Sequence, residues 1–102
     1  MDKKGALTLL GFAQKSQKLA AGESAVEVFM KKGKVKLLLL AEDQTDKGQQ
    51  KWCRLAEEQG IEAIVFATKE ELGQAIGLSP RSIVGIRDEQ MAKAILQKIT
   101  LS

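Results

Sequence analysis

The feature that most constrains the fold is a run of four consecutive leucines, Leu37 to Leu40, between Lys36 and Glu42. Successive side chains of a strand point to opposite faces of the sheet. A strand over 35–41 without polar alternation must therefore be buried on both faces, as in sheets covered by helices on each side. The segment 61–67 has the same apolar character and is predicted to be a second such strand.

Helical and strand-like segments alternate along the whole chain, and no linker or repeat interrupts them. Apolar residues at three- and four-residue spacing predict helices, whereas short apolar segments between turn signals predict strands. The expected helices are 6–17, 23–32, 45–59, 68–76 and a last one after Asp88, and the expected strands are 18–21, 35–41, 61–67 and 82–86. This alternation predicts the α/β class, as a three-layer α/β/α sandwich.

Several helix ends carry recognisable capping residues. Thr68 to Glu71 reads Thr-Lys-Glu-Glu, a capping box in which the hydroxyl and the carboxylate each accept a hydrogen bond from a backbone N–H at the helix start. Asp88 is expected to cap the last helix in the same way. Gly33 and Gly60 follow predicted helices, where a left-handed residue commonly ends the helix.

Aromatic residues make up only 4% of the chain, so the core is expected to be aliphatic. In the helix 45–59, Cys53 and Ala56 are predicted to face the core. Trp52 is interpreted as a packing residue rather than a base-stacking one, because a single tryptophan beside a core stripe usually packs. Each of these interpretations concerns the same helix and depends on which side of it meets the sheet.

The chain lacks the residues that most enzyme classes need. It has no histidine, the commonest general base and metal ligand, and its single cysteine can form neither an internal disulfide nor a metal site alone. No phosphate-binding or dinucleotide glycine motif is present. The acidic pairs Glu42/Asp43 and Glu70/Glu71 are interpreted as helix-start residues, where acids suit the helix dipole. We expect no catalytic site, no metal and no cofactor.

Length and hydropathy predict one cytoplasmic domain over 1–102. A chain of 102 residues is the size of one ordinary domain. No apolar run approaches the ~20 residues of a membrane-spanning helix, and the N-terminus lacks the long apolar stretch of a signal peptide. We therefore expect no contact with a membrane.

Positive charge is concentrated in the first third of the chain. Residues 1–36 hold eight lysines and three acidic residues, a net charge of +5, whereas residues 37–102 carry a net charge of −2. Such asymmetry is typical of proteins that bind polyanions. Charge alone leaves open that these lysines are ordinary solvated side chains that keep a small protein soluble.

Six segments in order resemble one known family. They are Leu10-Gly-Phe-Ala-Gln-Lys-Ser-Gln-Lys-Leu19, Gly22-Glu23, Lys32-Gly-Lys-Val-Lys-Leu37, Ala41-Glu-Asp43, Lys69-Glu-Glu-Leu-Gly73 and Ala75-Ile-Gly-Leu78. Their combination resembles the ribosomal L-seven-Ae/L-thirty-e family, most of all its bacterial type. The likeness covers nearly the whole chain.

The resemblance implies a fold, a partner and a site. The sheet would be mixed and four-stranded, and the protein would be an RNA-binding monomer that recognises kink-turns, sharply bent RNA helices with tandem sheared G·A pairs. Ribosomal RNA and other ribonucleoprotein proteins would be its partners. The start of the second helix would enter the groove at the G·A pairs, and the loop after the fourth helix would clamp a splayed-out base. The residues so implicated are Gly22, Glu23, Ser24, Lys31, Lys32, Lys34, Lys36, Leu78, Ser79, Pro80 and Arg81.

Physical chemistry agrees with this assignment. A helix start presents free amides and a partial positive charge, Gly22 permits close backbone approach, and proteins read RNA mainly where it departs from a regular duplex. The chain departs from the family at Ala25 and Val28, where relatives carry polar side chains that face the RNA, whereas Ser24 keeps a donor and an acceptor.

Two alternatives remain open at the level of sequence. Gly22 and the loop 78–81 could serve only as a turn and a connection. The loss of polar side chains at positions 25 and 28 would also suit a protein-interaction subunit of a ribonucleoprotein with weak RNA affinity of its own.

Overall fold

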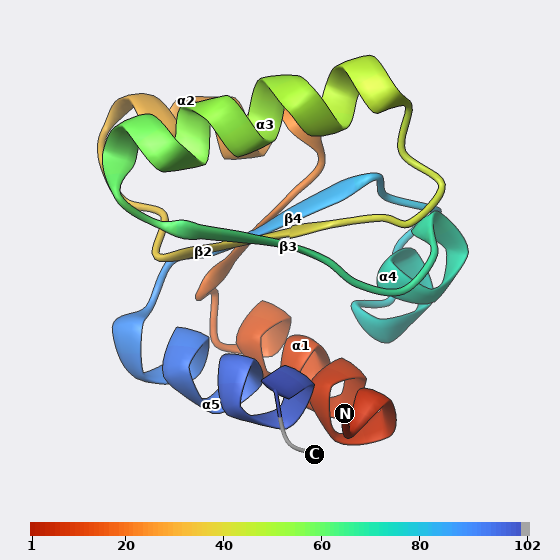
Figure 1. Cartoon of the computed structure of the whole chain (residues 1–102). Helices are drawn as coiled ribbons and strands as arrows, with labels where there is room; N and C mark the ends of the chain where they lie inside the picture. The colour runs from red at the N-terminus through yellow and green to blue at the C-terminus, as the bar shows by residue number, and fades with distance from the viewer. Residues whose placement is uncertain (101–102) are drawn as a thin grey trace.

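A computed structural model describes residues 1–100, so the last two residues of the predicted domain lie outside the described range. Over residues 1–100, helices and strands alternate as the sequence predicts (Figure 1). The elements are α1 (Lys3–Lys15), β1 (Leu19–Ala21), α2 (Glu23–Lys31), β2 (Leu37–Leu40), α3 (Asp46–Gln59), β3 (Glu62–Val65), α4 (Lys69–Ala75), β4 (Ile83–Ile86) and α5 (Glu89–Thr100).

The strands form a mixed four-stranded sheet in the order β1-β4-β2-β3. β4 runs antiparallel to both β1 and β2, with Ile86 opposite Leu19 on one side and opposite Leu37 on the other. β2 and β3 are parallel, with Leu37 opposite Glu62. It follows that β1, β2 and β3 point in the same direction and that their carboxyl ends lie at the same end of the sheet.

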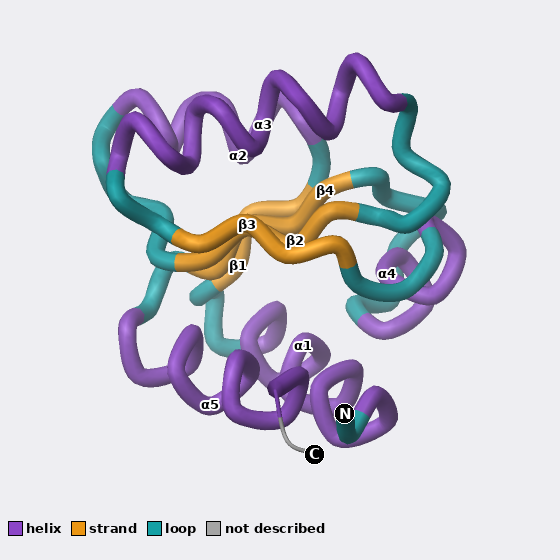
Figure 2. The backbone as a smooth tube through the Cα atoms, in the orientation of Figure 1, coloured by secondary structure: helices purple, strands orange, loops and turns teal. Residues whose placement is uncertain are grey.

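Helices cover both faces of this sheet, which confirms the predicted three-layer α/β/α sandwich (Figures 1 and 2). α2 and α3 lie on one face, α1 and α5 lie on the other, and α4 stands near one end. The four leucines of β2 are at most 2% exposed. Leu38 and Leu40 pack under α2 and α3, whereas Leu37 and Leu39 pack with residues of α1 and α5. Burial of the leucine run on both faces is thereby confirmed.

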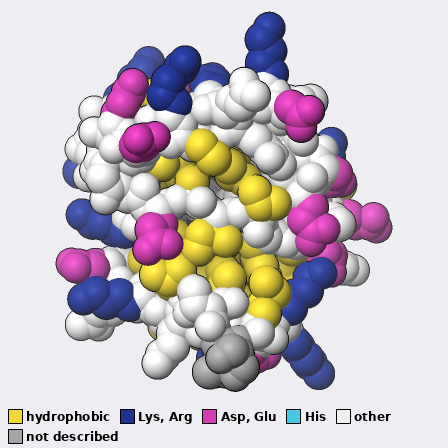
Figure 3. Space-filling model, viewed as in Figure 1, with side chains coloured by type: hydrophobic (Ala, Val, Ile, Leu, Met, Phe, Trp, Pro, Cys, Tyr) yellow, Lys and Arg dark blue, Asp and Glu magenta, His cyan; other side chains and the backbone are white. Residues whose placement is uncertain are grey.

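β3 differs from β2 because it is an edge strand. Its Glu62 is exposed, and Val65 keeps 46% of its surface exposed. The expectation that both apolar strands are covered on both faces is therefore wrong for β3, because apolar composition does not reveal that a strand has only one neighbour. Figure 3 shows hydrophobic side chains gathered along the strip where β3 lies, with charged side chains around them.

The inward face of α3 agrees with the prediction at Ala56 and differs from it at Cys53. Trp52 is fully buried and Ala56 is 2% exposed, whereas Cys53 is exposed. The packing role of Trp52 is confirmed and the inward orientation of Cys53 is wrong. Within residues 1–100 the buried indole Nε1 of Trp52 has no hydrogen-bond partner, and the Lys51 Nζ lies 4.9 Å from the centroid of the Trp52 ring.

The capping predictions are confirmed. The Thr68 hydroxyl accepts from the Glu71 N–H at 3.1 Å, while a Glu71 carboxylate oxygen accepts from the Thr68 N–H at 3.0 Å. The Asp88 carboxylate accepts from the Met91 N–H at 2.8 Å. Gly60 ends α3 in the left-handed conformation, with φ of 70°. These local signals fix where each helix begins or ends.

Candidate nucleic-acid interface

Three helix starts gather at one end of the sheet. The strands β1, β2 and β3 are followed by the helices α2, α3 and α4, respectively. The residues that immediately precede these helices are Gly22, Thr45 and Thr68, in the same order. Ligands of open α/β sheets bind outside the carboxyl ends of the strands, and helix starts offer unpaired amides and partial positive charge. We call this region, with residues 78–81 beside it, the site end.

Gly22 joins β1 to α2 in a conformation that suits only glycine. Its φ is +91°, in the region that side chains avoid. Its N–H donates to the carbonyl of Ile83 at 2.9 Å, which continues the pairing of β1 with β4. A Cβ placed on Gly22 would lie 3.5 Å from Cδ of Arg81. The two segments implicated by sequence, the start of α2 and the loop before β4, therefore lie side by side.

Arg81 organises the loop that faces Gly22. Its N–H donates to the Lys69 carbonyl at 3.0 Å. Its Nη1 donates to the carbonyl of Ser79 at 2.9 Å and to the Ser79 hydroxyl at 2.6 Å. Among the described residues, every hydrogen bond of this guanidinium comes from Nη1. The Nε and Nη2 groups therefore remain available to an acceptor outside the protein.

Gly73 lets this loop lie directly against α4. It is buried, and the Leu78 N–H donates to its carbonyl at 2.9 Å. A Cβ on Gly73 would come 2.8 Å from Cα of Pro80, which is closer than real Cβ contacts allow. Sequence reasoning quoted Gly73 only as part of the family likeness. Its role, to let the loop pack against α4, is apparent only from the positions of the Ser79 and Pro80 backbone.

The predicted lysines lie at the opposite end of the sheet. Lys36 immediately precedes β2, and its N–H donates to the Ile86 carbonyl at the far end of β4 at 2.7 Å. The nine residues of α2 separate Gly22 from Lys32 by roughly 15 Å at 1.5 Å per residue. We call Lys31, Lys32, Lys34 and Lys36 the lysine end. The structure thus brings together the other predicted site residues, Gly22 to Ser24 and Leu78 to Arg81, but not these four.

Two of these lysines already have partners within the protein. Lys31 pairs with Glu27, one turn earlier in α2, at 3.6 Å. The Lys32 Nζ lies 5.7 Å from the centroid of the Phe29 ring, and the Arg87 guanidinium lies 3.8 Å from that centroid. Stacking of cations on an aromatic ring is favourable. Part of the positive charge of the lysine end is therefore engaged in local structure.

Sequence reasoning missed a second group of cations beside the site end. Lys47, Lys51 and Arg54 line a cleft of about 570 Å³ together with Glu23, the first residue of α2. Their spacing of four and three residues places them on one side of α3. That spacing is visible in the sequence, but the net negative charge of residues 37–102 conceals a local group of cations.

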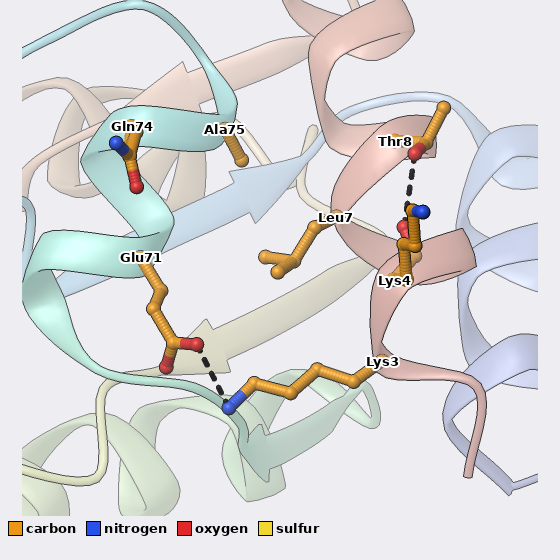
Figure 4. Close-up of a pocket in the computed structure, with 7 residues that line it drawn as sticks. All are labelled: Lys3, Lys4, Leu7, Thr8, Glu71, Gln74 and Ala75. Atoms are coloured by element: carbon orange, nitrogen blue, oxygen red, sulfur yellow. Dashed lines mark hydrogen bonds and ion pairs between the residues drawn. The ribbon is translucent and has the colours of Figure 1, made fainter.

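A cleft of about 550 Å³ between α1 and α4 is lined by residues whose interactions stabilise the fold (Figure 4). The Lys3 Nζ lies 2.9 Å from a carboxylate oxygen of Glu71 across it. The Lys3 ammonium, and next the Thr68 N–H, lower the pKa of Glu71 below its ordinary value. Asp43 likewise serves a helix start, accepting from the Lys69 N–H at 2.9 Å. Glu71 thus has the role predicted for the second acidic pair. Asp43 serves the start of α4 instead of the start of α3, which it precedes and which begins at Asp46, so the prediction of the helix for the first pair is wrong.

Two kinds of feature are absent from residues 1–100. No group of three or more His, Cys, Asp or Glu side chains is arranged to hold a metal ion in this range. No helix within it combines the length and the apolar character needed to cross a membrane.

Comparison with known proteins agrees with the fold. The model of the ribosomal protein L7Ae/L30e/S12e/Gadd45 family matches residues 5–96. A Bacillus halodurans protein of unknown function has a similar structure, with a TM-score of 0.88 and 28% identity over 92% of this chain and 95% of that one. A Giardia lamblia 15.5kD RNA binding protein has a TM-score of 0.75 and 20% identity over 91% of this chain and 80% of that one.

Proposed function

Because this chain belongs to the ribosomal protein L7Ae/L30e/S12e/Gadd45 family, we propose that it binds structured RNA of the kink-turn type through its site end. In this proposal Gly22, Glu23 and Ser24 approach the groove at the G·A pairs, and the segment 78–81 holds the base that the kink expels. The protein acts as a binding component of a ribonucleoprotein, with ribosomal RNA as one candidate, and not as an enzyme.

One observation carries the proposal, the contact between Gly22 and Arg81. The hypothetical Cβ of Gly22 lies only 3.5 Å from the Arg81 side chain, so an amide-rich helix start and a guanidinium with free donors share one surface. Phosphate and base acceptors in RNA match both kinds of donor. Leu78 is 39% exposed in the same loop and offers an apolar surface for an unstacked base.

The lysine end is given a weaker role in this proposal. At roughly 15 Å from Gly22 along α2, its charges act across more than the ~8–10 Å Debye length at ordinary salt. Lys31, Lys32, Lys34 and Lys36 therefore attract RNA at low salt, and Arg81 provides the contact that persists when salt is raised.

The test is a comparison of two RNAs. One is a kink-turn, and the other is the same sequence with its G·A pairs replaced by Watson–Crick pairs. The expected result is tighter binding to the kink-turn, with a preference of about tenfold or more, since one charged hydrogen bond of ~1.5 kcal/mol already gives that ratio. Equal binding of both RNAs would show that the site end does not recognise the kink.

A second candidate function rests on the exposed valine of α2. Val28 is 49% exposed one turn after Ser24, and Val65 is exposed at the end of β3. A contiguous exposed apolar surface is typical of protein contacts, and in this second candidate the two valines would contribute to such a surface. A ribonucleoprotein subunit that binds mainly protein would show weak RNA binding in the comparison above, and Val28→Lys would weaken its capture of a protein partner.

A further inference from the structure

We propose that Lys47, Lys51 and Arg54 form a track on α3 that binds the phosphate backbone of an RNA stem leaving the kink. This inference rests on the proposed function and extends it to a second surface. It assigns a binding role to a part of α3 that the sequence analysis did not single out. The three side chains are called the α3 track below.

The position of the cleft connects the α3 track to the site end. Glu23 lines the cleft with these cations, and it directly follows Gly22. Lys47 and Arg54 are seven residues apart, which is roughly 10 Å along a helix. The α3 track is therefore long enough to contact more than one phosphate of a stem backbone.

The cations of the α3 track are exposed and unpaired with any carboxylate of residues 1–100, so they can bind an external anion. All three side chains are exposed. No ion pair between residues 1–100 involves any of them, whereas Lys3, Lys18, Lys31, Lys93 and Lys98 are all paired. The ammonium of Lys51 lies 4.9 Å from the Trp52 ring centroid, a contact that favours one position of this side chain over others.

The lining of the cleft favours nucleic acid over protein. Besides the three cations it consists of Glu23, Thr45, Gly48 and Gln50, with no hydrophobic side chain. Protein interfaces depend on buried aromatic or aliphatic anchors, and none is available here. Three cations against one carboxylate, with a hydroxyl and an amide beside them, suit a phosphate backbone.

The test is a triple variant, Lys47→Ala, Lys51→Ala and Arg54→Ala, with a matched control. The control, Lys4→Ala, Lys15→Ala and Lys93→Ala, removes three exposed cations from α1 and α5 on the other face of the sheet. Both variants reduce the net charge from +3 by the same amount, and circular dichroism melting establishes that both remain folded. Binding to a kink-turn RNA with long stems is measured from about 50 to 200 mM salt.

The expected result is a change in the salt dependence of binding. Each lost phosphate contact lowers the slope of log affinity against log salt by about one unit. The α3 track variant should therefore lose two to three units of slope, and the control variant should keep the parent slope. On an RNA whose stems are cut back to the kink, parent and α3 track variant should bind alike.

Other outcomes overturn the inference and separate it from the proposed function. The inference is wrong if the α3 track variant keeps the parent slope of log affinity against log salt. It is also wrong if the control variant loses as much slope, because the α3 track would then make no specific contact with the RNA phosphate backbone. An unchanged RNA slope together with lost capture of an acidic protein would assign the surface to protein instead. If the parent fails to prefer a kink-turn, the proposed function fails, and the slopes on a plain duplex then decide whether α3 still binds phosphates.

Discussion

The two ends of the sheet carry positive charge in different ways. At the site end, Gly22 adopts a conformation available almost only to glycine, and Arg81 is tied to Ser79 by hydrogen bonds. At the lysine end, Lys34 and Lys36 are exposed and Lys31 is paired with Glu27. The site end therefore has a surface of defined shape, because its backbone geometry is constrained. The higher density of lysines at the lysine end does not by itself produce such a surface.

The largest expected effect comes from Gly22→Val. A branched side chain resists φ of +91° and would meet the Arg81 side chain at 3.5 Å, so the segment that faces the RNA has to shift. Returning it to the binding shape would cost up to ~3 kcal/mol, so kink-turn affinity should fall by up to about 100-fold. The measurement is a titration of parent and variant with the kink-turn RNA.

Gly33→Val is the matched control at the lysine end. Gly33 also has positive φ, +67°, but a Cβ there meets nothing within 4 Å. It should lower the melting temperature and leave kink-turn affinity close to that of the parent. Equal loss of affinity in both variants would remove the distinction between the two ends.

Gly73→Ala should be the next largest. The added methyl would come 2.8 Å from Pro80 Cα, so the loop has to move away from α4, at a cost of ~2 kcal/mol for overpacking. Kink-turn affinity should fall by about 30-fold.

Gly77→Ala serves as its control because it strains the backbone at φ of +73° without any neighbour within 4 Å. If Gly77→Ala reduced kink-turn affinity as much as Gly73→Ala, backbone strain near the loop would explain the loss of affinity. The close packing of the loop against Gly73 would then not be its cause.

A third comparison concerns the loss of kink-turn affinity when one arginine of the site end or two lysines of the lysine end are removed. Arg81→Ala should weaken kink-turn binding by about tenfold, the value of one charged hydrogen bond of ~1.5 kcal/mol. The double variant Lys34→Ala, Lys36→Ala should weaken binding only at low salt, because its charges are screened across the length of α2. Titrations at two salt concentrations distinguish them, and the prediction fails if the lysine variant loses more affinity than Arg81→Ala at high salt.

The smallest effect concerns the stability of α4, which carries the loop of the site end. The pKa of Glu71 is lowered in the folded protein, so its contribution is present above the ordinary value of 4.5 and is lost as pH falls through the folded value. Glu71→Gln should therefore lower the melting temperature slightly at pH 7, and the difference should vanish in acid. Glu89→Gln, which removes an exposed pair with Lys93, should change melting little at either pH.

Local chemistry explains what the sequence could predict. The capping box at Thr68 and the left-handed end at Gly60 depend on neighbouring residues alone, and the leucine run of β2 needs two covered faces in any fold. Trp52 and Cys53 show the limit, because both lie three or four residues before Ala56 and satisfy the same helical spacing. Only the position of α3 on the sheet decides which of them is buried.

The site was harder to predict than the fold for a related reason. Gly22 and Arg81 are far apart in the sequence, and their contact depends on the pairing of β1 with β4. Lys32 is near Gly22 in the sequence, but the length of α2 carries it to the other end. The family likeness therefore implicated residues at both ends of the sheet, and the sequence alone does not show that the sheet brings only two of the segments together.

The buried indole of Trp52 has a practical consequence. The chain contains one tryptophan and no tyrosine, so its ultraviolet emission arises from a single residue. This residue belongs to α3, and its side chain is fully buried between the helix and the sheet. The Lys51 ammonium lies over its ring. Emission should shift to longer wavelength when the helical layer separates from the sheet, and its intensity should change when a phosphate draws Lys51 away. The protein thus carries an intrinsic fluorophore that reports both unfolding and occupancy of α3 without any added label.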